Sequence, residues 1–82
     1  MVGGDAGNVA SGSYALVPGG FSNLAAGDYS FAAGRNASVI ATDPGSFLFA
    51  DSNNFQFPSI APNEFGVRAT GGVRFVTAID PA

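Results

Sequence analysis

The chain has 82 residues and a mass of 8.2 kDa, which is enough for one small domain. It contains no histidine, no cysteine and no lysine, so disulfides, Cys–His or Ser–His–Asp catalysis and lysine chemistry are all excluded. Three arginines and a net charge of −3 argue against a nucleic-acid interface. The sequence therefore predicts no enzyme, no cofactor, no metal and no insertion of this segment into a membrane.

So small a chain buries little apolar surface, and it has no disulfide to restrict its unfolded state. We therefore expect it to gain stability by association. Glycine contributes 12 residues, which is too many for stable helices, and disorder is excluded because 46% of the residues are hydrophobic.

From the N-terminus onward, the chain repeats itself. Three segments share a pattern of glycine, polar residue, aromatic residue, any residue and large apolar residue; they begin at Gly12, Gly27 and Gly45. A shorter unit that begins with asparagine precedes each of them, at Asn8, Asn23 and Asn36. Such a repeat holds two short strands and two tight turns, as in a β-solenoid.

We predict an all-β fold, a short-coil parallel β-roll over residues 1–52, with coils near 8–22, 23–35 and 36–52. Alternation within the coils indicates strands, whose side chains stack into ladders from coil to coil. The alignment predicts one ladder of Tyr14, Tyr29 and Phe47. It predicts a second ladder of Leu16, Phe31 and Phe49.

Residues 53–82 depart from the repeat and are predicted to form a C-terminal β segment that closes the roll. Residues 64–69 and 73–79 have the composition of strands, and Gly71-Gly72 between them favours a β-hairpin-like turn. The alternative is that Gly71-Gly72 forms a further corner of the solenoid.

The stretch from Ala10 to Gly34, with its short Gly-, Ala- and Ser-rich strands, resembles the head of trimeric autotransporter adhesins, the YadA-like left-handed parallel β-roll. The resemblance covers residues 8–52. The segments Gly45–Ser52 and Asn63–Phe75 are similar to those that close such rolls in bacterial surface proteins and in phage tail-fibre-like proteins. The coils depart from the family in length, which is 15 and 18 residues rather than a regular 14, and in their larger number of aromatics.

The resemblance implies a homotrimer that forms part of an extracellular fibre, on a cell surface or a virion, and a larger parent protein. It implies structural and adhesive function without chemistry. The expected partners are further copies of the chain and a host-surface or matrix ligand or glycan. No binding residue of the family carries over to a position of this sequence.

Eight apolar residues are candidates for the core or the trimer interface, because aromatic side chains dominate buried contacts: Tyr14, Leu16, Tyr29, Phe31, Phe47, Phe49, Phe65 and Phe75. The alternative is that exposed rings form a sugar-binding platform. The chain would then be the glycan-binding tip of a phage tail-fibre or lectin-like protein.

Arg68 and Arg74 flank one predicted turn, and we expect ion pairs with Glu64 or Asp80, or stacking on Phe75. Around a three-fold axis these arginines are also candidates to hold an anion. A calcium loop that starts at Asp51 is excluded, because its sixth position lacks the glycine and its twelfth position the glutamate that such loops need.

Overall fold

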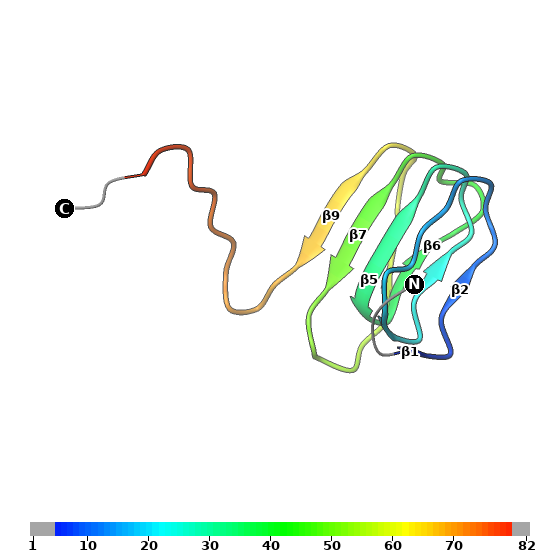
Figure 1. Cartoon of the computed structure of the whole chain (residues 1–82), viewed down its shortest axis with the longest axis horizontal. Coiled ribbons are helices and arrows are strands. Elements are labelled where there is room, and N and C mark those ends of the chain that lie inside the picture. The colour runs from blue at the N-terminus through cyan, green and yellow to red at the C-terminus, as the bar shows by residue number, and fades with distance from the viewer. Residues whose placement is uncertain (1–4, 80–82) are drawn as a thin grey trace.

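The computed structural model describes residues 5–79 and shows a parallel β-solenoid of about four turns with no helices. Every strand pairing in it is parallel (Figure 1). The predicted all-β parallel roll is therefore confirmed. Its assembly into a trimer stays a prediction.

Two sheets form the walls of the roll. A five-stranded sheet contains, in spatial order, β1 (Asp5–Ala6), β3 (Gly20–Phe21), β5 (Phe31–Arg35), β7 (Phe47–Ala50) and β9 (Phe65–Arg68). A four-stranded sheet contains β2 (Val9–Ala10), β4 (Leu24–Ala25), β6 (Ala37–Val39) and β8 (Phe57–Pro58). Because spatial order follows chain order in both sheets, the chain advances steadily from one end of the stack to the other.

The register of the strands corrects one of the predicted ladders. Tyr14 stacks on Tyr29, as expected, and Leu16 pairs with Phe31. Phe47, however, pairs with Phe31 and not with Tyr29. Phe49 consequently lies two positions further along the strand, in a different ladder.

The observed register of the third coil is explained by one corner of each coil, where the backbone takes a left-handed conformation. Tyr14, Tyr29, Gly45 and Asn63 occupy this corner with φ angles of 58°, 58°, 75° and 58°. The third coil therefore aligns with the others through Gly45 at the corner, and not through Phe47 matched to a tyrosine. Glycine and asparagine reach this conformation at the lowest cost, which explains their presence there.

Small aliphatic side chains fill the interior of the roll. The buried apolar residues are Val17, Ala25, Ala32, Ala37, Val39, Leu48 and Ala50. The backbones come so close at the turns that a Cβ on Gly12 would lie 2.2 Å from the carbonyl oxygen of Gly27. No aromatic ring is fully buried among the described residues; Phe57, which is half-buried, packs against this interior, and most of the other rings are exposed.

A buried asparagine ties three successive coils together. The Nδ2 of Asn23 donates to the Oδ1 of Asn8 at 3.1 Å and to the carbonyl oxygen of Gly34 at 2.8 Å. Its Oδ1 accepts the backbone N–H of Ala37 at 3.0 Å. Asn23 is only 1% exposed, so these bonds satisfy polar groups that water does not reach.

The C-terminal segment differs from both alternatives that the sequence left open. Residues 57–68 continue the roll, since they supply β8 and β9, which pair with β6 and β7. The hairpin prediction is wrong: the chain turns at Thr70-Gly71 and residues 73–79 form no strand. No further coil follows either, because this segment runs away from the roll with exposed side chains and pairs with no strand of the described chain (Figure 1).

A pair of glycines tests the close stacking of the coils. Gly34 and Gly72 have similar φ angles of 98° and 102°, but a Cβ on Gly34 would lie 1.7 Å from the carbonyl oxygen of Ala50, whereas Gly72 has no atom within 4 Å. We expect Gly34→Ala to lower the free energy of unfolding by about 3 kcal/mol or more, measured by urea denaturation. Gly72→Ala is the matched control and should cost about 1 kcal/mol or less. Equal costs would contradict close stacking as the reason for glycine at position 34.

Candidate functional site

The outer face of the five-stranded sheet carries large apolar side chains. Along β7, burial alternates: Leu48 and Ala50 point into the roll, while Phe47 and Phe49 point outward and are 36% and 40% exposed. On β9, Phe65 also points outward and is 64% exposed. Alternation of this kind normally leaves polar residues on the outer face. Here both faces are apolar.

Three phenylalanines of this face and Leu16, which lies outside the named strands, form one column that crosses four coils. The ring centroids of Phe31 and Phe47 are 4.2 Å apart with nearly parallel planes, and those of Phe47 and Phe65 are 5.0 Å apart. Leu16, which is half exposed, extends the column beyond Phe31. We call Leu16, Phe31, Phe47 and Phe65 the apolar column.

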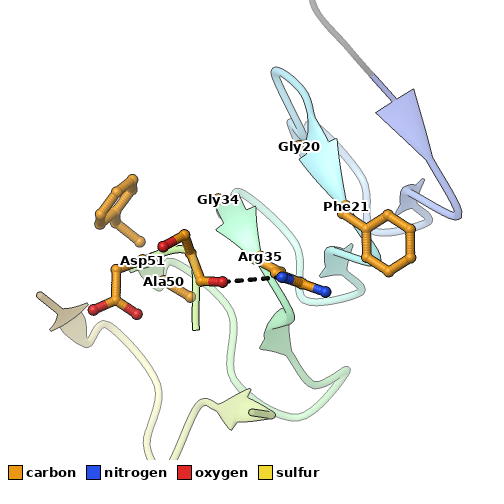
Figure 2. A pocket seen from close by; sticks show the side chains of 8 residues that line it. Gly20, Phe21, Gly34, Arg35, Ala50 and Asp51 are labelled. Atoms are coloured by element: carbon orange, nitrogen blue, oxygen red, sulfur yellow. Dashed lines mark hydrogen bonds between the residues drawn. The ribbon is translucent and has the colours of Figure 1, made fainter. Parts of the chain in front are cut away.

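A groove of about 300 Å³ lies beside this column, and Figure 2 shows the side chains that line it. Phe21 and Arg35 form one side, with the guanidinium 5.6 Å from the centre of the ring, and Phe49 and Asp51 also contribute. The Nη1 of Arg35 donates to the carbonyl oxygen of Ser52 at 3.1 Å. The Nε of Arg35 is buried and has no hydrogen-bond partner within residues 5–79. The groove thus has apolar walls and a guanidinium stacked on an aromatic ring.

A second exposed feature lies at the corner of the first two coils. The rings of Tyr14 and Tyr29 stack with centroids 5.2 Å apart and planes inclined by 12°. Their side chains are 81% and 68% exposed, which makes them one of the most accessible aromatic pairs of the described chain.

Arg68 does not pair with Glu64, which was one of the partners expected for it. Its Nε donates to the Oδ1 of Asp51 at 2.9 Å. Its two terminal nitrogens donate to backbone carbonyl oxygens of Arg35, Asp51, Asn53 and Phe55. Arg68 therefore fastens the loop between β7 and β8, and its donors are engaged by the protein itself.

The carboxylate of Asp51 is held from two sides. Its Oδ2 accepts the backbone N–H of Thr70 at 2.7 Å, and its Oδ1 accepts the Nε of Arg68. The hydrogen bond from Thr70, and after it the one from Arg68, holds the pKa of Asp51 well below its usual range, against the opposing effect of burial.

The remaining polar candidates lie apart from one another. Arg74 and Phe75 are exposed in the segment that leaves the roll, and Asp80 lies outside the described residues. A further carboxylate, that of Asp43, is buried, and its Oδ2 accepts the Ser59 hydroxyl at 2.6 Å. Within residues 5–79, no three His, Cys, Asp or Glu side chains come together as metal ligands, and no helix suitable for crossing a membrane occurs.

Sequence reasoning missed two features of this surface. Asp51 and Arg68 are 17 residues apart, which is about one coil, so a correct register would have brought them together. Arg35 as a lining residue of the groove is the second. Its stacking on Phe21 follows from the register that pairs Phe21 with Arg35 in neighbouring strands.

Comparison with known proteins gives no match to this chain, whether with family models, curated proteins or solved structures.

We call the hydrogen bonds by which Arg68 fastens the loop between β7 and β8 the Arg68 clamp. It can be tested by comparing substitutions of two arginines. Lysine keeps the charge but cannot reproduce the planar set of donors, so Arg68→Lys leaves several carbonyl oxygens without their partner. We expect a loss of about 2–3 kcal/mol in the free energy of unfolding, measured by urea denaturation. Arg74→Lys, in the exposed segment, should leave stability unchanged. A loss of the same size in both variants would contradict the clamp.

The lowered pKa of Asp51 also predicts a dependence of stability on pH. Since the pKa is lower in the folded chain, the carboxylate contributes full stability above the unfolded pKa of about 4 and loses it as the pH falls below that value. Urea midpoints should therefore decrease between about pH 5 and pH 2. Asp51→Asn should be less stable at pH 7 and should show a smaller decrease. An unchanged slope in the variant would refute the assignment.

Proposed function

We propose that the chain is a structural and adhesive module of an extracellular homotrimeric fibre. In this assembly three β-rolls pack together through the outer faces of their five-stranded sheets. The module acts through its shape and surface, without catalysis and without a cofactor.

The apolar column is the observation that carries this proposal. Soluble monomers rarely leave a continuous row of large apolar side chains in water. Burying one such ring contributes about 1.5–3 kcal/mol, and every chain of an assembly offers Phe31, Phe47 and Phe65. Contact between these faces would provide the apolar burial that the narrow interior of a single roll lacks.

The groove beside the column supports the same arrangement. Aromatic and arginine side chains are enriched at protein interfaces, and both line this groove. A neighbouring chain can fill the apolar space near Phe49.

The path of the chain favours a fibre. The strand order β1-β3-β5-β7-β9 carries the chain from one end of the stack to the other, so each coil adds about 4.8 Å along one direction. A segment of this form is suited to act as a spacer, because its two ends lie at opposite ends of the stack. The number of chains, three, comes from the resemblance to autotransporter heads.

The interface is tested by placing a charge on the apolar column. Phe65→Glu would bury a carboxylate between chains, so the assembly should dissociate, and sedimentation equilibrium should give the mass of one chain. Ile60→Glu is the control, because Ile60 is even more exposed, at 84%, and belongs to neither sheet. This variant should keep the mass of three chains.

Circular dichroism would establish that both variants retain their β structure. An unchanged mass for Phe65→Glu, or equal dissociation of both variants, would contradict an interface on the apolar column.

A further inference from the structure

Two tyrosines occupy a strained backbone position without any gain from burial. Tyr14 and Tyr29 both have φ angles of 58°, in the left-handed region where side chains other than glycine and asparagine are disfavoured by about 1–2 kcal/mol. The equivalent corners of the next two coils have Gly45 and Asn63, which tolerate this conformation. The fold thus requires the conformation but not the rings. A residue other than glycine or asparagine that is kept at such a strained position often has a function.

The stack of rings ends at Tyr29. One face of Tyr29 lies against Tyr14. The next corner is Gly45, which carries no ring, and the amide of Asn63 occupies the space that a Cβ of Gly45 would take. The ring of Tyr29 is accordingly 68% exposed. A flat group can therefore stack on the exposed outer face of this ring, beside the amide of Asn63.

We propose that the outer face of Tyr29, supported by Tyr14, is a stacking platform for a neutral pyranose ring of a glycan. The C–H bonds on one side of a pyranose form a flat, weakly apolar surface that stacks on an aromatic ring. Its hydroxyl groups, at the rim, need hydrogen-bond partners from the protein.

Two polar groups of the required kind lie on either side of Tyr29, one toward the first coil and one over Gly45. The exposed carboxylate of Asp28, next to Tyr29 in the chain, is held in place because its Oδ1 accepts the backbone N–H of Ser13 at 2.9 Å. The amide of Asn63 reaches back over Gly45, since its Oδ1 would lie 2.2 Å from a Cβ there. A carboxylate accepts hydrogen bonds from sugar hydroxyls, and an amide both donates and accepts them.

The arrangement also argues against other ligands. The carboxylate of Asp28 and the net charge of −3 disfavour acidic sugars and other anions. Quaternary ammonium groups are recognised by rings on several sides, whereas Tyr14 and Tyr29 are parallel and present one flat face. A neutral sugar fits both observations.

This inference names a ligand class for the adhesive part of the proposed function and rests on it to that extent. It does not depend on how many chains assemble, because Tyr14, Asp28, Tyr29, Gly45 and Asn63 all belong to one roll.

Saturation-transfer NMR on the full chain tests the platform, with the neutral β-linked disaccharides lactose, cellobiose and N,N′-diacetylchitobiose as probes. We expect at least one of them to receive saturation on the C–H protons of one ring, at millimolar concentrations. Tyr29→Asn should weaken this binding tenfold or more. Phe55→Asn removes another exposed ring, 73% accessible, and should leave binding unchanged.

Stability and mass distinguish a binding role from a packing role. Asparagine tolerates the left-handed corner, so Tyr29→Asn should be at least as stable as the parent chain and should have the same mass by sedimentation. Absence of transfer to all three disaccharides would overturn the proposal. Loss of stability or of assembly in Tyr29→Asn would overturn it as well, since Tyr29 would then be a packing residue. A monomeric parent chain that binds a disaccharide through Tyr29 would retain the platform and refute only the trimer.

Discussion

The close approach of successive coils is the constraint on which the rest of the structure depends. Carbonyl oxygens of one coil occupy the space where a Cβ of the preceding coil would lie, at Gly12 and at Gly34. The fully buried apolar side chains are therefore alanine, valine and a single leucine, and among the aromatic rings of the described chain only Phe57, half-buried, packs against them. Large apolar side chains are left for the outer surface, and that surface is what the protein offers to partners.

The same narrowness explains the polar groups of the interior. Buried backbone N–H and C=O groups at the turns need partners, and short polar side chains supply them without occupying much space. Asn23 bonds to three coils, the hydroxyl of Ser30 donates to the carbonyl oxygen of Gly27, and that of Ser46 to the carbonyl oxygen of Ala61. In the last coil, the longer side chain of Arg68 performs this role for the loop after β7.

Much of the solenoid fold could be predicted from the sequence, because the spacing of the glycines reflects the length of a coil and period-two alternation reflects the strands within it. Matching aromatic residues places the third coil in the wrong register, because the physical equivalence is a left-handed backbone that Tyr29 shares with Gly45. Pro44-Gly45 and Pro62-Asn63 were the available signal, as both are turn pairs. The prediction of a hairpin at Gly71-Gly72 is wrong because glycines of this kind indicate a bend in the chain, but they do not determine whether the residues after the bend pair with a strand. The clamp between Asp51 and Arg68 needed the register, which local pattern does not provide.

Association through the apolar column is the central claim, and the solution mass of the unmodified chain tests it most directly. Light scattering after size-exclusion chromatography, over a dilution series, should give a stable mass about three times the 8.2 kDa of one chain. A folded chain that remains a monomer at every concentration would contradict the claim, because the exposed column would then be stable in water without a partner.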